Sequence, residues 1–341
     1  MARRAFLLGG SGQTGRALAP RLLEQGWEVV VGSRGERPVP EGVEHVALDR
    51  ADTEALRAAL GTGVDALVDF VAFEPAHAEQ LLSLGDLARS LIVLSSGSVY
   101  TDAEGRTFDE AKTPDQFPHY PVPINERRQP TVAPGDATYS TRKAAIEQSL
   151  LGQDDVPATL IRAGAIYGPG GHSREWYFVK RILDRRPYVI LGGRGQSRFH
   201  TVSTENLAEL IWLAAERSGR RVLNAGDPDP PTLLEISRAV AAALEHEWTE
   251  VLLPTLEEPC DTPWSGPRPF VMDMSEAELE LGYRPVTTYE RAVVQTCEWL
   301  VEATRERAWE DVLPTLVEHM TESFDYERED ELVRCLTTTD G

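Results

Sequence analysis

Residues 5–15 read Ala5-Phe6-Leu7-Leu8-Gly9-Gly10-Ser11-Gly12-Gln13-Thr14-Gly15, an apolar run followed by a glycine-rich turn. The apolar run predicts a buried strand, and the pattern of residues 14–25 predicts a helix directly behind the turn. Glycines at these positions permit a tight turn and a close approach of the backbone to a pyrophosphate, and the start of a helix offers free N–H groups to negative charge. This stretch therefore predicts a dinucleotide site whose contacts come from Gly9, Gly12, Gln13, Thr14 and Gly15.

The alternation of strand-length apolar runs with helix-period segments continues through the first half of the chain. Strands are expected at 27–32, 43–48, 66–71, 91–94 and 158–161, and helices at 53–60, 76–84 and 137–151. This rhythm predicts βαβ units and an α/β fold with a Rossmann-like, doubly wound parallel sheet. Residues 102–136 interrupt it with six prolines. A segment of this length without regular structure usually forms a lid or a binding loop.

Three regions are expected along the chain. Residues 1–165 form an NAD(P)-binding Rossmann domain that includes the loop at 102–136, and residues 166–288 form a smaller substrate lobe interleaved with it. Residues 289–341 form an acidic helical tail, in which two amphipathic helices are divided at Leu313-Pro314. From position 301 onward the chain has 12 acidic and 4 basic residues, which is typical of a solvent-exposed helical face.

The composition argues against several classes of partner. The 341 residues include 34 Lys and Arg against 55 Asp and Glu, a net charge of −21 that opposes binding to nucleic acid or to an anionic membrane. No apolar stretch reaches the roughly 20 residues of a membrane span, and the run before Gly9 is too short for a signal peptide. Cys260, Cys297 and Cys335 are far apart and the histidines lack metal-binding spacing, so we expect no metal and a cytoplasmic location.

The segment Tyr139-Ser140-Thr141-Arg142-Lys143 falls on the helix expected at 137–151. Residues four apart share a helical face, so the Lys143 ammonium can lie beside the Tyr139 phenol and favour its ionised form. Ser96, at the end of the strand before it, can orient a substrate oxygen while the phenol gives or takes a proton and a hydride moves to or from a nicotinamide. The YxxxK spacing also arises by chance on amphipathic helices, but its place after a glycine loop and a serine-rich strand favours a catalytic set.

The end of the second strand indicates which cofactor is preferred. An acidic residue there would bind the ribose 2′-hydroxyl, whereas an arginine accommodates a 2′-phosphate. The sequence has Ser33 and Arg34 at this point, with Arg37 close behind, which favours NADP(H). Glu36 lies in the same turn, so NAD(H) is an alternative. Asp49, at the end of the third strand, is expected near the adenine, and a structural role as a turn residue is the alternative.

Taken together, these motifs resemble the extended short-chain dehydrogenase/reductase family, in its NAD-dependent epimerase/dehydratase branch. The resemblance covers residues 4–285 and depends on the glycine loop, the strand at 65–72 and the segments 95–100, 139–143 and 166–170, in that order. It implies that Ser96, Tyr139 and Lys143 are catalytic and that Lys143 and Val71 contact the cofactor. The substrate contacts that it implies come from Ser98, Tyr167, Arg198 and His200.

Two departures from the family pattern bear on the reaction. Dehydratases of the family have an Asp-Glu pair where this chain has Gly97-Ser98, and its nucleotide-sugar enzymes have an asparagine where this chain has Ala165. We therefore expect an NADP(H)-dependent oxidoreductase that transfers hydride at a carbonyl or hydroxyl carbon. The alternatives are a sugar or nucleotide-sugar epimerase and, in another class, a non-catalytic cofactor-binding or scaffold protein.

The substrate is expected to be a small molecule that is neutral or weakly polar. The proline-rich loop supplies apolar side chains that could cover such a molecule as the loop closes; they are Phe108, Phe117, Tyr120, Val122 and Ile124. The alternative is that these side chains only pack the loop onto its own domain. The sequence does not specify the substrate or the stereochemistry of the reaction, and a homodimer is an open option.

Overall fold

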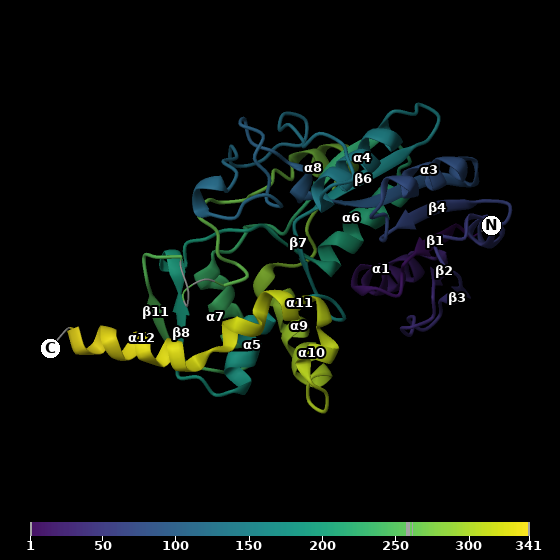
Figure 1. Ribbon diagram of the computed structural model, residues 1–341. Coiled ribbons are helices and arrows are strands. Elements are labelled where there is room, and N and C mark those ends of the chain that lie inside the picture. Colours follow the sequence, from purple (N-terminus) through teal and green to yellow (C-terminus); the bar gives the residue numbers. More distant parts are fainter. Residues whose placement is uncertain (1, 257–259, 261, 340–341) are drawn as a thin grey trace.

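The computed structural model describes residues 2–256, 260 and 262–339, and its centre is a sheet of seven strands (Figure 1). The strands are β1 (Arg4–Leu8), β2 (Glu28–Ser33), β3 (Glu44–Ala47), β4 (Val64–Asp69), β5 (Ala88–Ser96), β6 (Ala158–Ala163) and β10 (Arg221–Ala225). Their order is β10-β6-β5-β4-β1-β2-β3, and all neighbours are parallel. From β1 the chain order runs one way through β2 and β3 and the other way through β4, β5 and β6. The predicted doubly wound α/β fold is confirmed.

Helices cover both faces of this sheet. One face carries α1 (Gln13–Glu24), α6 (Thr204–Glu216) and α8 (Ser275–Leu281), and the other carries α2 (Thr53–Leu60), α3 (Pro75–Ser83) and α4 (Tyr139–Leu151). Successive side chains of β1 alternate between the two faces, so Ala5 and Leu7 pack in one core and Phe6 and Leu8 in the other. Because both faces are buried, β1 is apolar at every one of these positions.

A smaller lobe lies at one end of the sheet (Figure 1). It contains α5 (Trp176–Leu183), α7 (Leu233–Ala243), α9 (Tyr289–Ala303), the parallel pair β8 (Tyr188–Leu191) and β11 (Thr249–Leu252), and the parallel pair β7 (Ala165–Tyr167) and β9 (Thr201–Ser203). Its core is distinct from those of the main sheet and includes Trp176, Phe178 and Val240. The chain returns from this lobe to the main sheet through α6 and β10, so the two parts are interleaved in sequence.

The C-terminal segment differs from the two helices expected there. After α9 the chain forms α10 (Trp309–Val312), α11 (Pro314–Met320) and α12 (Tyr326–Thr339). One face of α9 is buried in the core of the lobe, and Glu329 of α12 is buried against Arg181 of α5. The apolar stripe of an amphipathic helix is present as expected, but that of α9 packs into the lobe and does not belong to a separate tail. Within the described ranges, no helix is long and apolar enough to cross a membrane.

Candidate active site

The glycine loop between β1 and α1 is shaped by the absence of side chains. Gly9 has a φ of 77°, in the left-handed region that glycine adopts freely. A Cβ on Gly15 would lie 2.3 Å from the Gly10 carbonyl oxygen, so a glycine is needed for α1 to pack against the loop. A Cβ on Gly12 would meet its nearest atom, the Gly9 oxygen, only at 3.4 Å. Gly12 is also the N-cap of α1 and offers no side-chain acceptor, which leaves the first N–H groups of the helix to an external anion.

The predicted catalytic residues meet at the carboxyl end of β5. Tyr139 is the first residue of α4, whose start is capped by the Thr138 hydroxyl, which accepts a hydrogen bond from the backbone N–H of Thr141 at 3.2 Å. Ser96 is the last residue of β5, and its hydroxyl hydrogen-bonds the Tyr139 phenol. Tyr139 is 38% exposed, on the cavity wall. The protein around it still raises the pKa of Tyr139 above its ordinary value, and the bond with Ser96 only partly opposes that rise. The phenol therefore carries its proton at neutral pH.

Lys143 follows one turn later on α4 and is 2% exposed. Its ammonium donates to the carbonyl oxygens of Ala72 at 2.7 Å and Leu94 at 2.9 Å, and it lies 5.7 Å from the centroid of the Tyr139 ring. Burial lowers the pKa of Lys143 to about 8, although nearby carboxylates counteract part of this shift. Since an ammonium has three hydrogens, one is left for a ligand.

A buried ion pair holds α4 against the sheet behind these residues. Glu147, one turn beyond Lys143, accepts hydrogen bonds from the guanidinium of Arg162 on β6, the shortest at 2.6 Å, and from the Ser95 hydroxyl at 2.6 Å. Nothing in the sequence pattern signals this pair, because it joins elements that meet only in the fold. It fixes the helix that carries Tyr139 relative to the strand that carries the serine.

Two adjoining cavities run along the carboxyl ends of the strands. The larger, of about 540 Å³, extends from the glycine loop to Ser96, Tyr139 and Lys143, and the other, of about 450 Å³, lies beside β2. All ten residues predicted to contact the cofactor line one or both of them: Gly9, Gly12, Gln13, Thr14, Gly15, Ser33, Arg34, Asp49, Val71 and Lys143. The structure therefore brings the predicted cofactor and catalytic residues together in one groove, where doubly wound folds bind their ligands.

The β2 end of the groove contains both charges that could select a cofactor. Arg34 is exposed and donates to the carboxylate of Glu36 at 3.1 Å. Both side chains line the smaller cavity, and the Ser33 hydroxyl hydrogen-bonds the ring of His45 at 2.9 Å. A 2′-phosphate would compete with this carboxylate for the guanidinium of Arg34.

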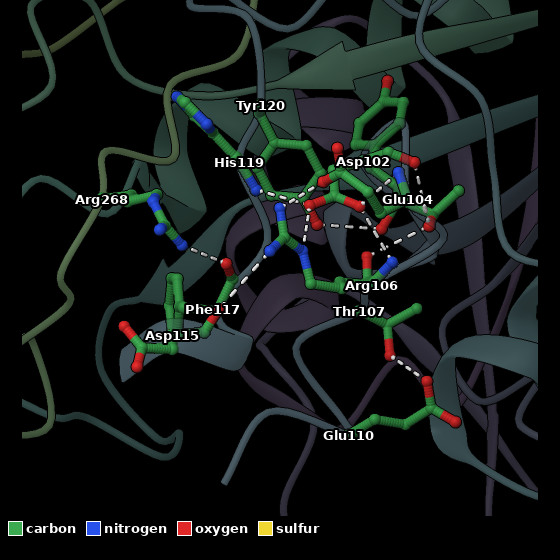
Figure 2. Close-up of polar contacts among 12 residues, drawn as sticks. Asp102, Glu104, Arg106, Thr107, Glu110, Asp115, Phe117, His119, Tyr120 and Arg268 are labelled. Carbon is green, nitrogen blue, oxygen red and sulfur yellow. Dashed lines mark hydrogen bonds and ion pairs between the residues drawn. The ribbon is translucent and has the colours of Figure 1, made fainter. Parts of the chain in front are cut away.

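The proline-rich loop is an organised structure built around Asp102 (Figure 2). Asp102 is buried and accepts hydrogen bonds from Arg106 Nε at 2.6 Å and from the backbone N–H of His119 at 2.9 Å. Elsewhere in the loop, Asp109 accepts a hydrogen bond from the backbone N–H of Ser140 at 2.7 Å. This bond places a carboxylate at the positive start of α4 and ties the loop to the helix of the catalytic residues.

The aromatic side chains of the loop pack against Phe199 and Phe270, which belong to the region 166–288. Between ring centroids, Phe108 lies 5.4 Å from Phe199 and 5.0 Å from Phe270, and Tyr120 lies 5.6 Å from Phe270. The described residues that line the two cavities include none of the five apolar loop side chains named above. The aromatic rings therefore join the loop to residues of the lobe, and Val122 is exposed. None of the five side chains is in a position to cover a ligand in the two cavities.

A sequence model of a protein family matches about two thirds of the chain. A model of the NAD dependent epimerase/dehydratase family matches residues 5–226, a range that contains the glycine loop, Ser96, Tyr139 and Lys143. The chain belongs to the NAD dependent epimerase/dehydratase family. The resemblance to extended short-chain dehydrogenase/reductases is thereby confirmed.

Relatives within this family differ in their reactions. The chain is 26% identical over 227 residues to 2-alkyl-3-oxoalkanoate reductase of Stenotrophomonas maltophilia, which covers 62% of this chain and 65% of that protein. It is 24% identical over 324 residues to dTDP-6-deoxy-L-talose 4-dehydrogenase (NAD(P)(+)) of Kitasatospora kifunensis, which covers 88% of this chain and 96% of that one. The solved structure of epimerase Mth375 from Methanothermobacter thermautotrophicus has a TM-score of 0.70 at 16% identity, covering 91% of this chain and 94% of that one. This last likeness is one of fold.

The residues predicted to contact substrate in this epimerase/dehydratase family member lie away from the cavities. Within the described part of the chain, the lining residues do not include Ser98, Tyr167, Arg198 or His200. His200 is buried, its Nε2 pairs with the carbonyl oxygen of Asp227 at 2.8 Å and its Nδ1 accepts from the N–H of Met272 at 2.9 Å. Arg198 donates to the carbonyl oxygen of Pro230 at 2.6 Å. These contacts organise the lobe and give no support to a role in substrate binding.

Other residues, which the sequence patterns did not assign to a substrate, line the larger cavity. His172 and Arg174 reach it from the segment between β7 and α5, and Arg37 lines both cavities from the turn after β2. The glycine- and proline-rich residues at 167–171 signal a turn here, but a turn does not reveal where the following side chains point. Among the residues that the structure describes, no group of three His, Cys, Asp or Glu could hold a metal ion.

Proposed function

We propose that this protein is an NADP(H)-dependent oxidoreductase that transfers hydride at a carbonyl or hydroxyl carbon, with Tyr139 as the general acid or base. The observation that carries the proposal is the position of Ser96, Tyr139 and Lys143 on the wall of the cavity that begins at the glycine loop. Two relatives within the family, a reductase and a dehydrogenase by name, support this class of reaction.

The groove has the features that a nicotinamide dinucleotide needs. There is open space in front of Gly12, the start of α1 lacks a side-chain cap, and one hydrogen of the Lys143 ammonium is unused. The buried Gln13 Oε1, beside the loop, has no hydrogen-bond partner in the described structure. When bound, the cofactor supplies or accepts the hydride.

The three polar side chains can then manage the substrate oxygen. Ser96 orients the carbonyl oxygen, and Tyr139 donates its proton to that oxygen as the carbonyl is reduced. The ammonium of Lys143 stabilises the phenolate that forms. A phenol at its ordinary pKa of about 10 is protonated at neutral pH, and the raised pKa of Tyr139 keeps it so. Within the proposed class we favour a carbonyl reductase or alcohol dehydrogenase over an epimerase, because Ala165 offers no side-chain donor where nucleotide-sugar enzymes of the family have an asparagine.

Arginines at the β2 end support NADP(H) over NAD(H). Arg34 and Arg37 both line the cavity where the adenosine half is expected, and a guanidinium can bind a 2′-phosphate with two parallel hydrogen bonds. Glu36 holds Arg34 in the structure, so NADP(H) binding would require this ion pair to open. If Arg34 and Glu36 stay paired and the Glu36 carboxylate binds the ribose hydroxyls, the protein would prefer NAD(H).

The test of the proposed function measures binding first and turnover second. NADPH fluorescence is titrated with the purified protein, and NADPH oxidation is then followed with a panel of aldehydes, ketones and oxo acids. Turnover with a carbonyl substrate is expected. Conversion of a nucleotide sugar to its epimer, with no net change in NADPH, would replace the proposal by the epimerase alternative. Tight binding of cofactor without turnover of any carbonyl or sugar would favour the non-catalytic alternative.

A further inference from the structure

Arg174 occupies an unusual place on the wall of the larger cavity. Its guanidinium carbon lies 5.0 Å from the centroid of the Phe199 ring and 5.3 Å from that of Trp264. Aromatic rings attract a guanidinium and restrict its position without neutralising its charge. The side chain is therefore held in place at the cavity, in the segment just before α5.

Among the described residues, the guanidinium of Arg174 has no hydrogen-bonded partner. No hydrogen bond or ion pair links its guanidinium to another residue in the described part of the chain. Its neighbour Glu175 is fully buried, accepts a hydrogen bond from Tyr289 and attracts Arg174 electrostatically, but it forms no ion pair with the guanidinium. Three other arginines with little exposure pair with carboxylates: Arg50 with Asp69, Arg162 with Glu147 and Arg181 with Glu329. Arg174 is only partly buried and its guanidinium faces the cavity, so its hydrogen-bond donors are available to a ligand that enters there.

The whole cavity has the same sign of charge. Its described lining includes Arg37, Lys143 and Arg174 and contains no Asp or Glu. The chain as a whole has an excess of 21 negative charges, so this concentration of cations around the catalytic residues is local. Lys143 is committed to two backbone carbonyls, and Arg37 lines both cavities and lies where the cofactor passes. Arg174 is the cation left for a second ligand.

We infer that Arg174 binds an anionic group of the substrate, a carboxylate or a phosphate, and so selects anionic carbonyl or hydroxyl compounds. This inference depends on the proposed function for the identity of the reacting group, although the anion site itself does not. The groove must also hold the nicotinamide end of the cofactor, so the space beside Arg174 suits a small molecule. The neutral substrate expected from the loop aromatics is replaced by a charged one.

The experiment measures thermal stabilisation of the protein saturated with NADP⁺, so that the cofactor's own phosphates already occupy the glycine loop. The probes are two matched pairs, hydroxybutyrate with its methyl ester and glycerol phosphate with glycerol. The wild-type protein should bind hydroxybutyrate or glycerol phosphate saturably and more tightly than the neutral partner. Arg174→Gln should weaken that anion about ten- to hundredfold, the range for a hydrogen bond to a charged group, and leave the neutral compounds unchanged.

Two variants serve as controls. Arg198→Gln removes a lobe arginine that does not line the cavity and should bind both probes as the wild type does. Arg174→Lys keeps the charge and should retain part of the affinity, which separates loss of the cation from misfolding. The inference would be overturned if neither hydroxybutyrate nor glycerol phosphate binds saturably, or if Arg174→Gln binds the anion as tightly as the wild type does. Anion binding should persist in Tyr139→Phe, so failure of the proposed catalysis is distinguishable from failure of the anion site.

Discussion

Replacement of Lys143 by methionine tests the burial of the catalytic ammonium. The change removes the charge and two hydrogen bonds to backbone carbonyls but keeps a side chain of similar length. It should abolish turnover, because it removes the cation that stabilises the Tyr139 phenolate. It should also weaken the binding of the cofactor, because it removes the hydrogen proposed to bind it. Its effect on the free protein is the more informative result, because it can be calculated from the structure.

The size of that effect follows from the pKa of Lys143. Burial lowers it from 10.5 to about 8, and at 1.36 kcal/mol per unit this places the cost of the buried ammonium near neutral pH at about 3 kcal/mol. Between those two pKa values the unfolded chain binds more protons than the folded one, so the free energy of unfolding rises with pH. Between about pH 7 and about pH 9.5, roughly 2 kcal/mol of the cost is relieved. The methionine variant has no such titration.

Denaturant unfolding of both proteins across this pH range gives the difference in their free energies of unfolding. The wild type should gain roughly 2 kcal/mol relative to Lys143→Met as the pH rises. This slope does not depend on the separate loss of two hydrogen bonds, which is the same at every pH. Lys112→Met changes an exposed lysine and should leave the difference flat. A flat difference for Lys143→Met as well would refute the assignment of a desolvated ammonium.

Two further predictions concern the cofactor. Arg34→Ala should weaken NADPH by about ten- to hundredfold and leave NADH nearly unchanged, as measured by fluorescence titration, because the guanidinium has no 2′-phosphate to bind in NADH; equal losses would show that Arg34 does not select the cofactor. Gly12→Ala should keep the wild-type Tm but weaken the binding of NADPH, because its Cβ has room in the free protein yet projects into the cofactor site. Gly15→Ala should lower the free energy of unfolding by about 1–3 kcal/mol, because its Cβ meets the backbone of Gly10. The same response of Tm in both variants would contradict this reading of the loop.

The parts of the fold that the sequence predicts are those encoded by neighbouring residues. The strand-turn-helix at the glycine loop, the order of strands and helices, and the face shared by Tyr139 and Lys143 each follow from local periodicity, and the structure contains all of them. The ten predicted cofactor contacts line the groove because the carboxyl ends of parallel strands lie along one edge of the sheet.

The parts that it misses depend on contacts between distant segments. The ion pair of Glu147 with Arg162 joins a helix to a strand, and Arg174 reaches the cavity from an irregular turn whose side-chain directions have no periodicity. His200 is a polar residue of the kind that suggests a ligand, but its ring is used to hold two backbone segments together. In the C-terminal segment, the amphipathic pattern indicates that α9 has an apolar face but not which core that face joins, and in the structure it completes the lobe.

Proton transfer by Tyr139 is tested by the Tyr139→Phe variant. The measurement is kcat together with the Kd for NADPH, with Tyr120→Phe as the matched control, since that phenol bonds a backbone carbonyl outside the cavities. Tyr139→Phe should lose at least about a hundredfold in kcat, the lower range for general acid–base catalysis, and bind NADPH as the wild type does. Tyr120→Phe should keep the wild-type kcat. A kcat for Tyr139→Phe within tenfold of the wild type would contradict the mechanism.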